Sequence, residues 1–544
     1  MSRVRVQATI RLTLESPFVS QGLTSAGFGF DVAQARGADG KVLLPGDLLR
    51  GNLRQAFLDL GFDPGPLFGR ESADGDEPAR GRLILGDLVA VTSESNGASL
   101  TRIEIADDTG SVESGALVCI ELPFPIGQQV VLEGPLILVT TDKTEIDRLG
   151  KALRLIPAIG AFKSVGFGRV EKAEIVKSSR RSLVLPSPRA TGGDRVQATM
   201  TFDRPLLVDA RRIADNVFQG AEVIPGAVLK GALAVRLDGA LAQDLTAAVF
   251  GHAFPLFDDS ETLSHQALPL SLVCDADQTI LRDALHCDRR EPPLPSGKAP
   301  KFRTDWKSPD DLLREHGLTP DRGFAFDTRT RTAIDPERGA AKDGQLFSYS
   351  MVVPGDCRWR AVIDRGDATH DGFRTLLAVL EEGLDGIGKS QARAEIRLSD
   401  APPPVAEPVP GNGDLWALTL STPALLNTPE ALKEPEDLRK DYASYWRHAA
   451  GMELINFFAT QRLAGGYQAI RYPSRKDGYY PWLLTEPGSV FLLKGDGTVL
   501  SQLLRGNLPL PPWLAGADWK TCPFIPGNGY GAFRLNAAMG VRHV

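Results

Sequence analysis

The chain has 544 residues, of which 42% are hydrophobic, and a formal net charge of −7 at pH 7. That length predicts three or four domains, while the negative charge argues against indiscriminate nucleic-acid binding and leaves room for a local basic groove. No stretch approaches the roughly 18 consecutive apolar residues that a membrane span needs, so we expect a cytoplasmic protein with no membrane partner. The five cysteines are scattered and odd in number, which favours a reducing compartment.

Three predicted strands share an alternating pattern of polar and apolar residues that stops at a proline. The pattern LTLESP ends at Pro17, MTFDRP ends at Pro205 and LTLSTP ends at Pro423. Because proline cannot donate a hydrogen bond to a neighbouring strand, each of these prolines marks the end of its strand. The repetition predicts three modules.

Two segments rich in Pro, Ser and Gly divide the chain at the places that this repetition requires. They carry no apolar period and are interpreted as linkers near 181–194 and 401–411. The modules are therefore placed at 1–180, 195–400 and 412–544.

A loop rich in glycine and other small residues follows the first strand and leads to Asp31. Two interpretations of Asp31 stay open at this point: its carboxylate caps a turn, or it acts on a ligand. Asp39 lies in ADGK, a hairpin-type turn that already explains an aspartate there.

The next predicted element is a helix that begins at a Pro-Gly pair and occurs twice. LLPGDLLRGNLRQAF begins at residue 43 and VIPGAVLKGALAVRL at residue 223. The free N–H groups of such a helix start can meet a phosphate, with Arg50 and Arg54 one turn apart beside the first copy and Lys230 beside the second. The alternative is that Pro-Gly simply starts a helix.

Another pair of segments repeats in the same order along the chain. RIEIADDTGSVESGALV begins at Arg102 and RTAIDPERGAAKDGQLF at Arg331, and they match without a gap at Arg, Ile, Gly, Gly and Leu. Conserved order and spacing within one chain indicate repeated structural units.

Each module ends in a glycine-rich loop. In the first module Lys163, Ser164, Gly166, Gly168 and Arg169 combine backbone that can approach a ligand closely with cations that suit a phosphodiester. The alternative is a tight turn with solvated charges. The third module carries IPGNGYGAFRLN from residue 525.

The second module's loop, GLDGIGKS, matches the phosphate-binding loop of many ATPases in composition. That motif needs a strand before it and a helix after it, whereas here helical periodicity precedes the loop and strand alternation follows it. We therefore interpret Lys389 as the counterpart of Lys163 and do not expect nucleotide hydrolysis.

With these motifs in view, most of the chain resembles the RAMP superfamily of CRISPR-associated proteins. The carriers are PGDLLRGNLR, LFG followed by GRLILGDL, TRIEIADDTGSVESGAL and SVGFGRV; the later part resembles a larger type III-D subunit through PLSLVC, RTAIDPERGAAKDGQLFSY and EPGSVFLL. The resemblance implies an α+β fold of tandem modified ferredoxin-like (RRM-like) modules. It also implies a cytoplasmic type III effector subunit with guide RNA, target RNA and other effector subunits as partners.

The same resemblance implies a role for Asp31 as the residue that supports cleavage of guide-paired target RNA with Mg²⁺ or Mn²⁺. Asp215, in the second module, lacks the glycine-rich approach and is a poor candidate. The alternatives are a non-catalytic scaffold or capping subunit and, from another class, a general RNA chaperone. A guide-processing enzyme is disfavoured, since the first histidine is His252.

Two further groups of residues receive structural interpretations. Cys274, His286, Cys287 and Cys357 lack CxxC or HxxxH spacing, so we do not expect a structural zinc. A helical apolar stripe predicts core positions in the third module, with base stacking as the alternative, for Tyr442, Trp446, Phe457 and Phe458.

Overall fold

The computed structural model describes residues 3–535 with gaps. These gaps are 21–29, 38, 71–78, 96–97, 104, 106–107, 109, 113–116, 190–192, 215, 258–266, 287–293, 295–297, 308–309, 317, 319–322, 335–340, 402–413, 429–434, 466–480 and 505–506. No helix in this described part is both long and apolar enough to span a membrane.

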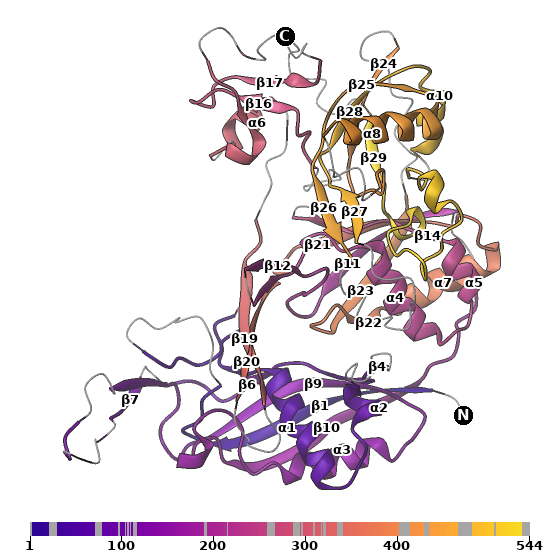
Figure 1. Cartoon of the computed structure of the whole chain (residues 1–544). Helices are drawn as coiled ribbons and strands as arrows, with labels where there is room; N and C mark the ends of the chain where they lie inside the picture. Colours follow the sequence, from indigo (N-terminus) through magenta and orange to yellow (C-terminus); the bar gives the residue numbers. More distant parts are fainter. Residues whose placement is uncertain are drawn as a thin grey trace.

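The first module is an antiparallel sheet covered by two helices. The strand order is β10-β1-β9-β6-β2, and β5 also pairs with β9. The bounds are β1 (Val4–Glu15), β2 (Leu43–Leu44), β5 (Leu83–Leu85), β6 (Leu88–Ala90), β9 (Gln129–Thr140), β10 (Val170–Ser182), α1 (Gly46–Asp59) and α3 (Glu145–Leu155). Alternate residues of β1 are buried, since one face of the sheet packs against α1 and α3 (Figure 1).

The second module repeats this arrangement. Its strand order is β14-β21-β11-β23-β22, with β15 also on β21, so β11 lies between β21 and β23 as β1 lies between β9 and β10. The bounds are β11 (Arg195–Phe202), β14 (Val249–Phe250), β15 (Phe254–Leu256), β21 (Arg358–Asp364), β22 (Leu384–Ile387), β23 (Ala392–Asp400), α4 (Gly226–Leu237), α5 (Ala242–Ala247) and α7 (His370–Glu381).

The third module has the sheet order β25-β28-β24-β29, again with its first strand between two later ones. The bounds are β24 (Leu415–Leu420), β25 (Glu453–Phe458), β28 (Val490–Lys494), β29 (Phe533–Leu535), α8 (Pro435–Ala450) and α10 (Thr498–Leu503). Tyr442 and Trp446 on α8 have no exposed surface and pack in this module's core, which confirms the core interpretation for both.

The three sheets establish an α+β fold built from repeated modules. Each sheet has its own hydrophobic core, and the largest clusters of buried residues lie within 6–173, 196–396 and 416–533. The exact module boundaries stay predictions, since 190–192 and 402–413 lie outside the described residues.

Two hairpins extend from the first and second sheets, and both carry the repeated Arg segment. One pairs β7 (Ala98–Arg102) with β8 (Val118–Leu122), and the other pairs β19 (Phe326–Ile334) with β20 (Ala341–Val352). Figure 1 shows the second hairpin reaching from the second sheet down to the first. It joins a sheet with β12 (Arg211–Ala214) and β13 (Val217–Gln219).

Short elements complete the described chain. They are α2 (Gly65–Phe68), β3 (Gly69–Arg70), β4 (Ala79–Arg80), β16 (Leu272–Cys274), β17 (Leu281–Asp283), β18 (Lys301–Phe302), α6 (Asp310–Glu315), β26 (Gln461–Ala464) and β27 (Trp482–Thr485), with 3-10 turns at η1 (Lys163–Val165), η2 (Ala284–His286), η3 (Arg303–Asp305), η5 (Pro512–Leu514) and η6 (Pro526–Asn528).

The ATPase-like loop has the surroundings that the sequence predicts. Helix α7 precedes it, β22 enters it and β23 follows it, so no helix begins where a phosphate-binding loop requires one.

Candidate nucleic-acid interface

The start of α1 lies in a tight backbone environment that requires glycine. A Cβ on Gly46 would lie 2.6 Å from the carbonyl oxygen of Gly86. The N–H of Gly46 donates to Asp87 Oδ1 at 2.8 Å, so a carboxylate of the same module already occupies this helix start. A phosphate would have to displace or share that contact.

Arg50 turns its guanidinium toward backbone carbonyls. Nη1 donates to the carbonyl of Leu83 at 2.8 Å and Nη2 to that of Phe68 at 2.9 Å. Burial lowers the pKa of Arg50. Arg54, one turn further along α1, is half-buried. Both stay predicted RNA contacts, but the contacts of Arg50 are those of a residue that fastens the helix to its module.

Lys230 takes the place of Arg50 in the second helix start and is 9% exposed. Its ammonium lies 3.3 Å from the carbonyl oxygen of Thr246 and 5.7 Å from the centre of the Phe250 ring. Burial lowers the pKa of Lys230 to about 8. The structure therefore places Lys230 inside the chain, which corrects its expected position on a surface open to RNA.

The first module's glycine loop presents an exposed basic surface. Lys163, Ser164, Gly166 and Arg169 are exposed, whereas Gly168 is buried. Gly168 has φ +69°, and a Cβ there would collide with the carbonyl oxygen of Ile159, so only glycine fits.

Arg169 is the partly neutralised member of this loop. Its guanidinium pairs with Glu15 at 3.6 Å and Glu171 at 3.2 Å. Because these exposed pairs are weak, Arg169 can exchange them for another anion at little cost.

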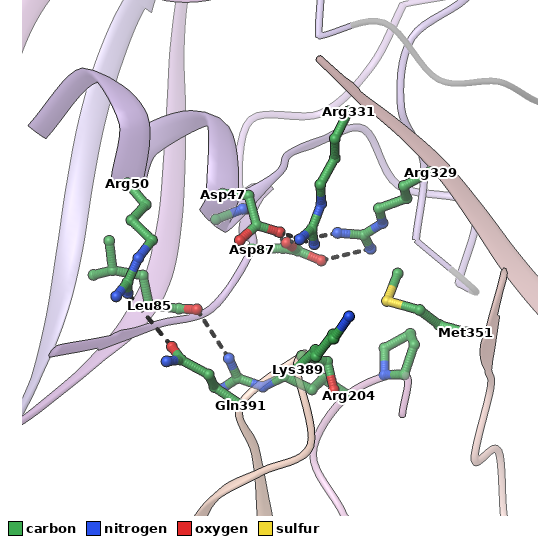
Figure 2. A pocket seen from close by; sticks show the side chains of 13 residues that line it. Asp47, Arg50, Leu85, Asp87, Arg204, Arg329, Arg331, Met351, Lys389 and Gln391 are labelled. Atoms are coloured by element: carbon green, nitrogen blue, oxygen red, sulfur yellow. Dashed lines mark hydrogen bonds and ion pairs between the residues drawn. The ribbon is translucent and has the colours of Figure 1, made fainter. Parts of the chain in front are cut away.

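Lys389 lies in a pocket between the first and second modules (Figure 2). Two aromatic rings lie near its ammonium group. Its side chain is exposed, and Nζ lies 5.1 Å from the ring centre of Tyr349 and 5.8 Å from that of Phe218. The guanidinium of Arg331 lies 4.9 Å from the Tyr349 ring. Such a surface is suited to binding a nucleic-acid strand, because cations contact phosphates and aromatic rings stack with bases.

Two arginines of this pocket, Arg329 and Arg331, are paired with carboxylates of the first module. Arg329 donates to Asp87 at 2.9 and 2.7 Å, Arg331 pairs with Asp47, and Arg204 donates to the carbonyl of Leu85 at 3.0 Å. Figure 2 shows Arg329 and Arg331 facing the two aspartates across the module junction.

The sequence interpretation did not include the residues of β19 and β20 that line or adjoin this pocket, although the sequence of β19 contains a pattern that indicates them. In β19, FDTRTRTAI alternates, so Arg329 and Arg331 share one face of the strand. Tyr349 faces Arg329 across the hairpin. The alternating arginines beside an aromatic strand could have predicted a basic and aromatic face.

Asp31 lies beside β8 of the first hairpin with an exposed side chain. Its Oδ2 accepts a hydrogen bond from the backbone N–H of Cys119 at 2.7 Å, and its own N–H donates to the carbonyl of Cys119 at 2.9 Å. Val32 continues this contact as a parallel bridge to Ile120. The structure thus fixes the orientation of the carboxylate while leaving it accessible.

The equivalent strand position in the second module carries no carboxylate. Phe218 pairs in parallel with Tyr349 as Val32 does with Ile120, which places Val217 at the position of Asp31. Asp215, the disfavoured candidate, lies outside the described residues.

The residues considered for zinc or for proton transfer are placed as follows. Cys274 and Cys357 are buried thiols, Cys287 lies outside the described residues, and no group of three or more metal-binding side chains forms within the described part. His252 is buried against the Tyr530 ring, with its pKa lowered by burial to about 3.

Comparison with known proteins gives a family match within the first module. Residues 11–171 match the model of the RAMP superfamily. No curated protein matches the chain.

Two solved structures are similar to part of the chain. One is a chain of type III-B Cmr-beta bound to cognate target RNA, seen by cryo-EM, with 15% identity and a TM-score of 0.25; the match covers 32% of this protein and 61% of that chain. The other is a chain of type III-B Cmr-beta in the apo state, with 11% identity and a TM-score of 0.25, covering 31% of this protein and 97% of that chain.

The first and second sheets share one strand arrangement, in agreement with the repeated motifs. In both, the first strand is central, a hairpin carries the repeated Arg, and a glycine loop leads into the last strand. The elements that form the candidate interface, a hairpin and a glycine loop, therefore occur in both modules.

Proposed function

We propose that the chain is a subunit of a type III CRISPR effector complex that binds the backbone of the guide RNA. The observation that carries this proposal is the exposed Lys389 beside Tyr349 and Phe218, within a protein whose residues 11–171 match the RAMP superfamily. Phosphate contacts fix position without reading sequence, which leaves sequence choice to pairing between guide and target.

The first module offers a related arrangement at the corresponding place. The guanidinium of Arg102 lies 5.4 Å from the ring centre of Phe162, and exposed Lys163 follows in the glycine loop. Two modules with a cation, an aromatic ring and a glycine loop can hold successive parts of one RNA strand.

The finer part of the proposal is that Asp31 supports cleavage of the target RNA paired with the guide. The Cys119 N–H holds one oxygen of the carboxylate and so restrains its direction. Asp31 would be the residue of this chain that holds Mg²⁺ or Mn²⁺, since hard divalent cations prefer carboxylate oxygens. The ion would supply charge stabilisation at the phosphodiester.

The first testable prediction concerns Asp31→Ala in the assembled complex with guide RNA and Mg²⁺ or Mn²⁺. We expect one cleavage position to disappear while assembly and target binding stay near wild type, because the exposed side chain contributes little packing. Denaturing gels of labelled target RNA measure the products.

Asp39→Ala is the matched control, since Asp39 is an exposed aspartate in the neighbouring turn. If every product band persists in Asp31→Ala, the chain acts as a non-catalytic guide-binding scaffold. Loss of the band in both variants would assign the effect to the loop rather than to the Asp31 carboxylate.

A further inference from the structure

A short parallel pairing holds the segment that carries Asp31 against β8. The N–H groups of Asp31 and Val32 donate to the carbonyl of Cys119 at 2.9 and 3.2 Å, and the N–H of Glu121 donates to the carbonyl of Val32 at 2.9 Å. At Gln34 a side chain takes over from the backbone, because Oε2 of Glu121 accepts the Gln34 N–H at 2.8 Å. Glu121 therefore holds this segment through both its backbone and its carboxylate.

The other oxygen of the Glu121 carboxylate is held by Arg36. Nη2 of Arg36 donates to Oε1 of Glu121, while Nη1 donates to Glu94 Oε2 at 2.8 Å and to the carbonyl of Gly40 at 2.7 Å. The Glu121 side chain is 12% exposed. Charge-assisted hydrogen bonds are stronger than neutral ones, and partial burial protects them from screening by solvent. Glu121 is thus fastened at both oxygens to one segment, through Gln34 and through Arg36.

The second module holds the corresponding segment in a different way. In the alignment of the two hairpins, Ser350 takes the place of Glu121. Gly220 takes the place of Gln34, and its N–H donates to the backbone carbonyl of Ser350 at 2.9 Å. The second module, which has Val217 where the first has the proposed cleavage residue, therefore holds this segment without a glutamate. The carboxylate contact accompanies the aspartate in the first module.

We propose that Glu121 is a positioning residue for Asp31 in the cleavage of target RNA. This rests on the proposed function, because it concerns the residue to which cleavage is assigned there. Glu121 fastens the chain three residues after Asp31, at Gln34, and so fixes the direction of the Asp31 carboxylate against β8. A site with a lone carboxylate depends on such alignment, since a displacement of about 1 Å can cost about a hundredfold in rate.

The test compares Glu121→Ala with wild type in the assembled complex with guide RNA, over a series of Mn²⁺ concentrations. We expect the maximal rate of target cleavage to fall about tenfold or more, because Asp31 is then held less firmly. We also expect the Mn²⁺ concentration that gives half the maximal rate to rise. Guide RNA content and target binding stay at the wild-type level.

Glu133→Ala is the matched control. Glu133 is an ion-paired glutamate of β9 in the same module, and its guanidinium partner is Arg11 on β1. This variant removes a similar ion pair and a similar charge at a position where the partner lies on another strand. We expect it to leave both the cleavage rate and its Mn²⁺ dependence unchanged.

Glu121→Gln tests the role of the carboxylate in steps. Its amide oxygen can still accept the N–H of Gln34, while the ion pair with Arg36 is lost. We therefore expect a cleavage rate between those of wild type and Glu121→Ala. This partial rescue separates the hydrogen bond to Gln34 from the charge.

Hydrogen–deuterium exchange supplies a readout that needs neither metal nor cleavage. In Glu121→Ala we expect faster exchange in the peptide that contains residues 31–36, and unchanged exchange in peptides from α1 and α3, since the loss is confined to one local contact. Melting curves of the same preparation report whether the fold is kept, and we expect Glu121→Ala and Glu133→Ala to melt alike.

Three results overturn the inference: wild-type cleavage in Glu121→Ala, unchanged exchange in residues 31–36, or a loss of cleavage that comes with loss of target binding or assembly. The last of these assigns Glu121 to the fold alone. If Asp31→Ala keeps every product band, the proposed cleavage fails and this inference fails with it. Cleavage that needs Asp31 but not Glu121 overturns this inference alone.

Discussion

Arg50 and Lys230 show what a repeated motif does and does not predict. The sequence correctly places both beside helix starts, where phosphate binding is a reasonable expectation. In the structure each lies next to the glycine loop of the following module, Arg50 beside Gln391 and Lys230 beside Gly527. Periodicity within a module cannot reveal which part of another module covers that position, so the burial of Lys230 was not predictable.

Lys230 leads to a prediction about pH. Its folded pKa of about 8 lies below its ordinary value of 10.5 because burial disfavours the charged ammonium. Between those two values the unfolded chain holds a proton that the folded chain has lost, so Lys230 makes the free energy of unfolding rise with pH.

We expect Lys230→Met to stabilise the second module near pH 7, on the order of 3 kcal/mol, because the pKa falls from 10.5 to about 8 and one pKa unit corresponds to about 1.4 kcal/mol. The advantage over wild type shrinks as pH approaches 10. Melting curves at pH 7 and 10 measure it, with exposed Lys440→Met as the control. A pH-independent difference would contradict the assignment to Lys230 titration.

The hairpins were predictable as repeated segments, and their positions were not. The ungapped match between the segments at Arg102 and Arg331 predicts equivalent elements, which the hairpins β7–β8 and β19–β20 confirm. The contact of β19 with the first module includes the ion pair between Arg329 and Asp87, which are far apart in the sequence. Local pattern carries no information about such a long-range ion pair.

Lys389 and Tyr349 give the prediction for the second hairpin. We expect Lys389→Ala to weaken guide RNA binding and reduce the slope of log affinity against log salt by about one, because one phosphate contact is lost. Tyr349→Ala removes the aromatic surface and is expected to weaken binding with little change in that slope.

Filter binding at several salt concentrations measures both effects. Lys440→Ala, at an exposed position of α8, is the matched control. An unchanged salt slope in Lys389→Ala would show that its ammonium contacts no phosphate. ATP turnover by the wild-type chain would instead favour the nucleotide-binding interpretation of GIGKS.

The three modules form a directional series in which the glycine loops of the second and third modules each lie on the helix start of the preceding module. The strands that end in proline and the repeated motifs predict the number and order of the modules, because both are local features of the sequence. They do not predict the junctions, because the junctions depend on charges from distant segments. Asp385 of the second module pairs with Arg5 of the first at 2.6 Å and with Arg393 at 2.8 Å.

These junction charges predict that the first module separates from the second in acid. Burial raises the pKa of Asp87 and Asp385. Arg329, the Gly46 N–H and Arg204 together outweigh burial for Asp87, and Arg5 with Arg393 does so for Asp385, so both pKa values are lowered. Carboxylates with lowered folded pKa values contribute stability that is present above their unfolded value and is lost as pH falls through the folded value.

We therefore expect the radius of gyration, measured by small-angle X-ray scattering, to rise below about pH 4 before the modules themselves unfold. The double variant Asp87→Asn with Asp385→Asn is expected to show that expansion already at pH 7, since Arg329 and Arg5 keep their charges without carboxylate partners. Asp437→Asn, on α8 of the third module, controls for the loss of a negative charge. If the double variant keeps the wild-type radius at pH 7, apolar and backbone contacts hold the junction and the acid effect comes from elsewhere.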